Sequence, residues 1–177
     1  ADDATQEALA AALTQALPRM PALQHAGIVL YRAGTAPWHD DLPTLQRLAA
    51  RLTARAPARP VAVWHGTHLW TTIALIAAAR AGIASSLHAR LVAQAFARLA
   101  VSLRPPSGDA RKLDAVITTW PGADDTPGAT TAVAPADLPA TLATALAVPP
   151  QRRHQAARAL ADTARRAAEA LRDEPIR

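Results

Sequence analysis

The sequence contains no cysteine, a single lysine and few aromatic side chains. The absence of cysteine excludes disulfides, a thiolate nucleophile and metal centres held by cysteine. Arginine supplies 18 of the 19 basic residues, and the net charge of +5 is spread along the chain. Because the arginines do not alternate with aromatic residues, the pattern is not that of a single-stranded nucleic-acid surface. We therefore expect no nucleic-acid partner.

Long hydrophobic runs are also missing. The longest one, residues 69–79, includes two threonines and is shorter than the stretch of about 18 residues that a membrane helix needs. No basic segment typical of a signal peptide stands at the start of the sequence. With 50% hydrophobic and 19% charged residues, the composition favours a folded chain over a disordered one. We expect a soluble, cytoplasmic protein without membrane contact.

Helical and strand patterns alternate along the chain. Apolar runs rich in strand formers predict strands, and apolar residues three or four apart predict helices. The strands are expected at 27–31, 60–64, 113–120 and, as a short fourth one, 130–134; the helices are expected at 3–17, 41–55, 68–81, 87–103, 137–147 and 151–173. This order predicts an α/β fold of three layers, with a mostly parallel sheet of three or four strands flanked by helices.

The helix boundaries have local signals. Asp2 or Asp3, Asp40 or Asp41, Thr67, and Ser85 or Ser86 can each cap the start of a helix. Gly82 is a typical residue to end one. The α/β domain is expected to cover residues 1–148. Residues 149–177 form an Ala-rich helix that packs on this domain, on a protein partner or on a second copy of the chain.

The candidate site follows from the order of the strands. In open α/β sheets, ligands bind at the carboxyl ends of the strands. Three of the four tryptophans lie near such ends, although large aromatic residues also pack there without a ligand. The expected ligand-binding residues are Tyr31, Arg32, Gly34, Thr35, Trp64, Gly66, Thr67, His68, Thr118, Thr119 and Trp120.

The segment after the second strand has the features of an anion site. Gly66 lets a ligand approach the backbone, and the free N–H groups of the following helix favour a phosphate or a carboxylate. For an enzyme, the candidate acid/base is His65, with Asp40 or Asp41 nearby. The alternatives are a turn in which His65 bonds to backbone and aspartates that only cap a helix. No His-x-x-x-His pair is present, so no metal site is expected, and no cofactor is identified.

Two resemblances bear on the function. The stretch His65-Gly66-Thr67 resembles the His-Gly-Thr segment of ADP-ribosyltransferases, which implies that His65 holds the ribose of NAD. The tyrosine and glutamate that this family carries further along have no matching positions, since the only tyrosine, Tyr31, lies upstream. The layout of residues 28–52, 61–82 and 113–122 resembles the α/β module of thiamine-diphosphate enzymes and molybdopterin oxidoreductases. Such modules bind nucleotide-like groups or have become structural.

Three hypotheses for the function follow. The first is an α/β domain that binds a small anion or a nucleotide at its strand ends, as a subunit or domain of a larger enzyme. The second is a separate transferase or hydrolase that uses His65 as its acid/base. The third is a scaffold or assembly subunit that acts through its Ala-rich helices.

Overall fold

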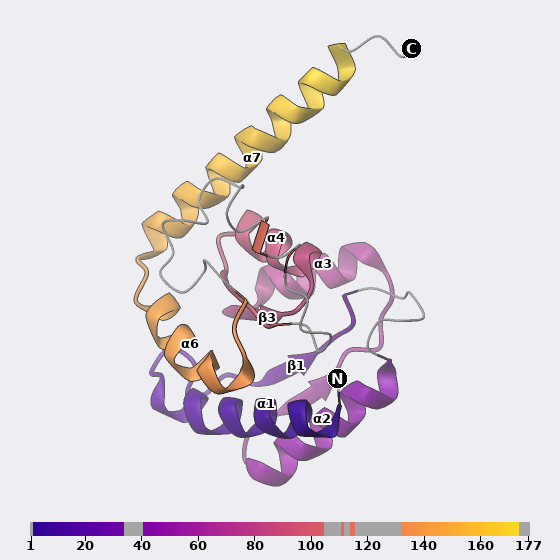
Figure 1. The fold of residues 1–177 in the computed structure, drawn as a ribbon, viewed down its shortest axis with the longest axis vertical. Coiled ribbons are helices and arrows are strands. Elements are labelled where there is room, and N and C mark those ends of the chain that lie inside the picture. Colours follow the sequence, from indigo (N-terminus) through magenta and orange to yellow (C-terminus); the bar gives the residue numbers. More distant parts are fainter. Residues whose placement is uncertain (1, 34–40, 105–110, 112–113, 116–131, 174–177) are drawn as a thin grey trace.

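The computed structural model describes residues 2–33, 41–104, 111, 114–115 and 132–173. Figure 1 shows a body of short parallel strands and surrounding helices, from which the last helix projects. The α/β class predicted from the sequence is confirmed.

The first half of the fold agrees with the sequence. Helix α1 covers Asp3–Ala16 and is followed by a short 3-10 turn, η1 (Leu17–Arg19), then by strand β1 (Ile28–Leu30), helix α2 (Leu42–Arg55) and strand β2 (Val61–Val63). The predicted aspartate caps are present: the carboxylates of Asp2 and Asp41 accept hydrogen bonds from the backbone N–H groups of Thr5 and Thr44, at 2.7 and 2.8 Å. These caps fix where the two helices start.

The middle of the chain departs from the sequence prediction. Helix α3 ends early, at Leu69–Ala78, and strand β3 (Ala81–Ala84) follows, so Gly82 lies inside a strand and does not end the helix. The predicted helix over 87–103 is likewise wrong in its second half, because helix α4 (Leu87–Ala95) gives way to strand β4 (Leu99–Ser102). Thr67 is not the cap of α3, since His68 occupies that position. Ser86 caps α4 as predicted.

The end of α4 explains why β4 was not predicted. Ala97 adopts a left-handed backbone conformation, with φ at 54°. The N–H of Arg98 then donates to the carbonyl of Ala93 at 2.8 Å, and that of Ala97 to the carbonyl of Gln94 at 2.9 Å. This pair of bonds is the common termination in which glycine usually occupies the left-handed position. With alanine there, the sequence carries no stop signal.

The C-terminal part begins with a short 3-10 turn, η2 (Pro135–Asp137), and continues into helices α6 (Leu138–Leu146) and α7 (Pro150–Asp173). Both helices agree with the sequence prediction. Asp114 and Ala115 are helical, which contradicts the predicted strand 113–120 at these two residues. Most of that predicted strand lies outside the described residues. Of the short fourth strand, Val133 pairs in parallel with Leu103 in an isolated bridge.

The described strands form two separate parallel pairs. Ile28 to Leu30 of β1 pair with Val61 to Val63 of β2, and Ala81 to Ala84 of β3 pair with Leu99 to Ser102 of β4. The direction of the strands is the predicted one. Among these four strands, however, no pairing joins β1 to β3, so they do not form a single sheet.

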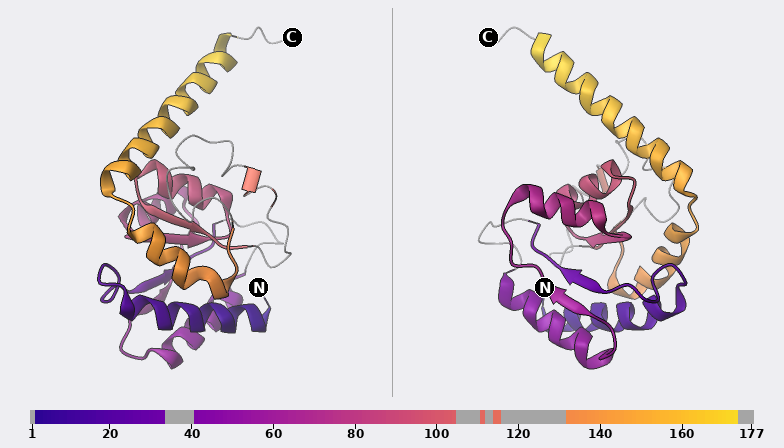
Figure 2. Two further views of the ribbon diagram at one scale, coloured as in Figure 1. Left: turned by 60° about the vertical axis from the view of Figure 1, so that its left-hand side comes forward. Right: turned by 180° about the vertical axis from the view of Figure 1, so that it is seen from behind.

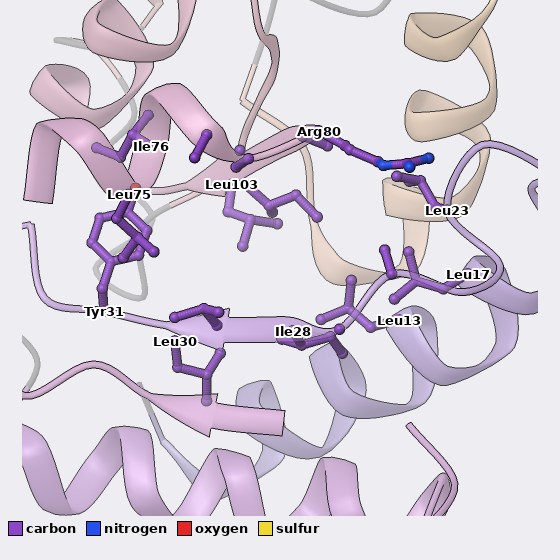
Figure 3. Close-up of a pocket in the computed structure, with 18 of the residues that line it drawn as sticks. Leu13, Leu17, Leu23, Ile28, Leu30, Tyr31, Leu75, Ile76, Arg80 and Leu103 are labelled. Atoms are coloured by element: carbon purple, nitrogen blue, oxygen red, sulfur yellow. The ribbon is translucent and has the colours of Figure 1, made fainter. Parts of the chain in front are cut away.

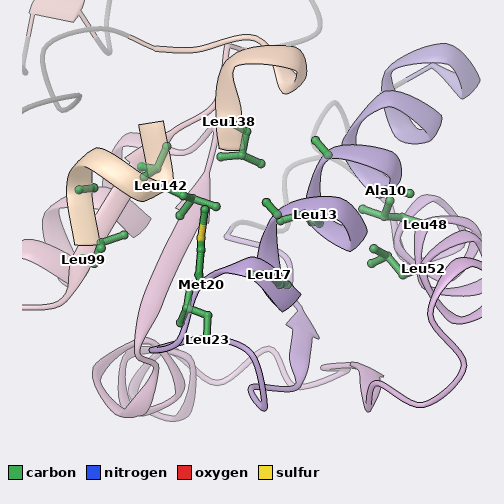
Figure 4. Packing of buried hydrophobic residues seen from close by; sticks show 14 residues of the cluster. Ala10, Leu13, Leu17, Met20, Leu23, Leu48, Leu52, Leu99, Leu138 and Leu142 are labelled. Atoms are coloured by element: carbon green, nitrogen blue, oxygen red, sulfur yellow. The ribbon is translucent and has the colours of Figure 1, made fainter. Parts of the chain in front are cut away.

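Helices cover both sides of the strands. On one side, α1 contacts α2 and α6, α2 contacts β2, and α6 contacts β4. On the other side, α3 and α4 pack together, and α4 also contacts β3 and β4. The main core lies on the first side (Figure 4). Leu52, Leu138 and Leu142 are fully buried there, and burial of each such side chain stabilises the fold by about 1.5–3 kcal/mol.

Helix α7 starts beside the body of the protein, and its C-terminal part projects away from it (Figure 2). Its first part packs against α4, with Leu160 buried. Residues 164–170 are exposed along the outer part of the helix. Among the helices that the structure describes, α7 included, none combines the length and the apolar character needed to cross a membrane.

Candidate functional site

The parallel pair β1–β2 brings two of the predicted segments to one edge. The N–H of Trp64 donates to the carbonyl of Leu30 at 2.7 Å, which continues the pairing one residue beyond Val63. Tyr31 and Arg32 therefore leave β1 beside the segment that starts at Trp64. This edge combines an arginine, two histidines and two aromatic residues, which lie in residues 31–32 and 64–68.

The other predicted site residues cannot be placed at this edge. Gly34, Thr35 and Asp40 follow Arg32 in the sequence but lie outside the described residues, as do Thr118, Thr119 and Trp120. Their part in a site stays a prediction.

Two helices begin at this edge, and their N-termini differ. The carboxylate of Asp41 already occupies the start of α2, and its hydrogen bond from Thr44 lowers the pKa of Asp41 below the usual range. At the start of α3, His68 makes no capping bond through its side chain, and the first turn carries no acidic residue. The N–H groups of α3 thus face no carboxylate of their own, which suits the binding of an external anion.

Gly66 is required by packing. A methyl group on its Cα would lie 2.5 Å from a ring carbon of Trp64, so the indole ring rests directly against the glycine backbone. The indole N–H of Trp64 is buried and has no hydrogen-bond partner in the described part of the chain. This contact gives Gly66 a structural role beside the predicted one in ligand approach.

The arrangement offers little acid/base chemistry. His65 and His68 are both exposed. Asp41, the partner considered for His65, serves as a helix cap, and its lowered pKa makes it a poor proton acceptor near neutral pH. Within the described ranges, no group of three or more His, Asp or Glu side chains is arranged to hold a metal ion. The half-buried Arg32 and the exposed imidazole groups are better suited to holding an anion than to moving a proton.

Sequence reasoning missed two polar features near the strands. Arg90 of α4 is only 3% exposed, and its guanidinium donates to the hydroxyl of Ser102, at the end of β4, at 2.8 Å. Burial lowers the pKa of Arg90. Tyr31 packs against the buried cluster to which Ile76 of α3 and Ala93 of α4 belong, and burial raises the pKa of its hydroxyl. The contact between Arg90 and Ser102 had no signal in the sequence, because the prediction assigned residues 99–103 to a helix. Tyr31 is among the predicted ligand-binding residues, and only its burial is new.

The fold and this edge define the chain as an α/β domain with parallel strands and a basic, aromatic strand end. Comparisons with protein-family models, with curated proteins and with solved structures found no match. The function is therefore argued from the residues alone.

Proposed function

We propose that this chain is a ligand-binding α/β domain that holds a small anion or the phosphate of a nucleotide at the C-terminal ends of β1 and β2. The observation that carries the proposal is the start of α3, which has no side-chain cap and is separated from the end of β2 only by residues 64–68. Arg32 and the two histidines at positions 65 and 68 supply positive or polar groups at the same edge. An anion there would gain both backbone N–H donors and a guanidinium.

The contrast with α2 supports the location. Both helices begin after a strand of the same pair, yet only α2 carries its own carboxylate, Asp41, at the N-cap. Two helix starts at one strand edge usually attract negative charge. Among the described residues, the start of α2 has a capping carboxylate and the start of α3 has none.

The test is calorimetric titration with inorganic phosphate and with adenosine monophosphate. We expect binding by the unchanged chain and a loss of about tenfold or more in Arg32→Gln, because a hydrogen bond to a charged group contributes about 1.5–3 kcal/mol. His65→Gln should weaken binding less, because glutamine keeps a hydrogen-bonding side chain at this position.

The matched control is Arg98→Gln. Arg98 is exposed and precedes β4, at the opposite end of the strands, so the change removes the same charge from the chain. Affinity should be retained. Equal losses in both arginine variants, or no binding of either ligand at millimolar concentration, would show that the strand end is not an anion site.

A second candidate function is supported by α7. Residues 157, 160, 164 and 167 recur at alternating spacings of three and four and are alanine or leucine, which is the spacing of a helix-pairing seam. Leu160 is covered by the body of the protein, whereas the alanines at 164 and 167 are exposed. We propose that the outer part of α7 pairs with α7 of a second copy.

Light scattering after size exclusion tests this pairing. Ala164→Glu together with Ala167→Glu should convert a dimer into a monomer, and Arg165→Glu, on the charged side of the helix, should not. A monomeric unchanged chain at 100 μM, as an order of magnitude for a weak interface, would remove this candidate.

A further inference from the structure

A cavity of about 480 Å³ lies between β1 and β3. Strands β1 and β3 form two of its walls, and α1 and the end of α3 supply much of the rest (Figure 3). Among the described residues that line it, all are apolar or glycine except Tyr31 and Arg80. A cavity of about 150 Å³ with such walls holds a benzene molecule, so this one has room for a considerably larger apolar group.

The cavity exists because the two strand pairs do not join. The backbone groups of Ile28 and Leu30 form hydrogen bonds on the β2 side. The N–H of Ile28 donates to the carbonyl of Pro60, and the carbonyl of Leu30 accepts from the N–H of Trp64. The backbone groups of Val29, which alternate with these, point the other way. On β3, the carbonyl of Ala84 accepts a hydrogen bond from the N–H of Leu103, on the β4 side. Because backbone groups alternate in direction along a strand, the N–H and carbonyl of Ile83 face away from β4. No described strand therefore pairs with the facing edges of β1 and β3.

The two ends of the cavity differ in chemistry. Tyr31 lies beside Leu75 at one end, where the strands finish, and Arg80 lies near Leu23 at the other (Figure 3). Arg80 is exposed, and its guanidinium donates to the carbonyl of Ala22 at 3.0 Å. No acidic residue is among the described residues that line the cavity. An apolar interior with one exposed cation at one end matches a molecule with an aliphatic chain and an anionic head.

The Arg80 end of the cavity is held by arginine side chains. Arg59 donates through its guanidinium to the carbonyls of Leu23, Gln24 and Ala26, and Arg80 holds that of Ala22. These bonds fix the segment between η1 and β1, which passes over the Arg80 end. This end of the cavity is therefore a fixed part of the fold, which favours binding to a preformed site.

We propose that this cavity binds a single-chain amphiphile, a medium-chain carboxylate, with its chain between β1 and β3 and its carboxylate at Arg80. The site is separate from the anion site proposed at the start of α3. Tyr31 closes the cavity at the end nearer to that edge.

Octanoate and its neutral analogue octan-1-ol are the probes, and calorimetric titration is the measurement. The unchanged chain should bind both, with octanoate the tighter. Arg80→Gln should weaken octanoate about two- to fivefold and leave octan-1-ol unchanged, because an exposed ion pair contributes little. Equal affinity for both probes in the unchanged chain would contradict the role of Arg80.

Two variants fill the cavity from its lining. Ala79→Leu at the end of α3 and Ala26→Leu before β1 should each lower octanoate affinity at least tenfold while keeping or raising the melting temperature. Ala74→Leu is the control, since Ala74 is exposed on α3 and outside the lining. Binding that survives both filling variants would overturn the proposal.

Amide hydrogen exchange of the ligand-free chain gives an independent readout. The open edges of β1 and β3 predict fast exchange at the N–H groups of Val29 and Ile83, relative to those of Ile28 and Leu30. Strong protection of Val29 and Ile83 would mean that the two strand pairs join in solution and that no cavity is present. That result, like the absence of binding by either probe, overturns the proposal.

Discussion

At the scale of single residues, Ala97 is the position where sequence and structure disagree most clearly. Leu91, Ala95 and Leu99 fit one helical stripe, and this periodicity predicts an uninterrupted helix. The left-handed conformation of Ala97 breaks it, at a cost of roughly 1–2 kcal/mol for a residue with a Cβ atom. The packing of β4 compensates for this cost, and such compensation has no signature in the local sequence.

Ala97→Gly should stabilise the protein by about 0.5–1 kcal/mol. Glycine removes the left-handed penalty but makes the unfolded chain more flexible, which offsets about 0.4–1 kcal/mol of the gain. Urea unfolding measures the difference, and the slope should stay unchanged.

Ala74→Gly in the exposed interior of α3 is the control, because there the same change costs about 1 kcal/mol. A loss of stability in both variants would contradict the conformation found at Ala97.

At the scale of elements, the predictable parts have strong local signals and the others do not. Capping aspartates, prolines and leucine stripes define α1 and α2, and β-branched runs define β1 and β2. Strand β3 reads Ala-Gly-Ile-Ala, and three of these four residues rarely favour strands. Pairing with β4 makes it a strand. The cavity depends in turn on how β3 lies against β1, so no sequence pattern predicts it.

Contact between elements also produces a pH dependence. Glu7 of α1 pairs with the guanidinium groups of Arg55 and Arg51 of α2, the latter at 3.1 Å. These hydrogen bonds hold the pKa of Glu7 below its usual range. Because the folded pKa is lower than the unfolded one, the contribution of Glu7 is present above the unfolded value of about 4.3 and is lost as the pH falls through the folded pKa.

Glu7→Gln should therefore flatten the loss of stability below about pH 4.3, as measured by thermal unfolding across pH 2 to 7 at low salt. The effect should shrink at high salt, since the pair is exposed. Glu169→Gln on the exposed part of α7 removes the same charge and serves as the control. An unchanged pH profile in Glu7→Gln would contradict the contact between α1 and α2.

At the scale of the whole molecule, the two strand pairs are joined by side chains in place of hydrogen bonds. The main core takes buried residues from α1, α2, α6 and β4, and partly buried residues from β1, β2 and β3 pack against it. Helix α1 lies over both pairs, because its leucines line the cavity between them and its C-terminal end belongs to that core. The pairs should consequently unfold together, although no backbone bond between them is present in the described strands.

Leu142→Ala tests this coupling. Leu142 of α6 is fully buried, so the change should destabilise the protein by about 2–5 kcal/mol. Exchange of the slowest amides in β2 and in β4 should accelerate by the same factor, because both report one cooperative unfolding event. Leu69→Ala, at a side chain that is 65% exposed, should change stability by less than about 0.5 kcal/mol. Acceleration confined to β4 would show that β1 and β2 form an independently stable unit and that the core between the pairs does not couple them.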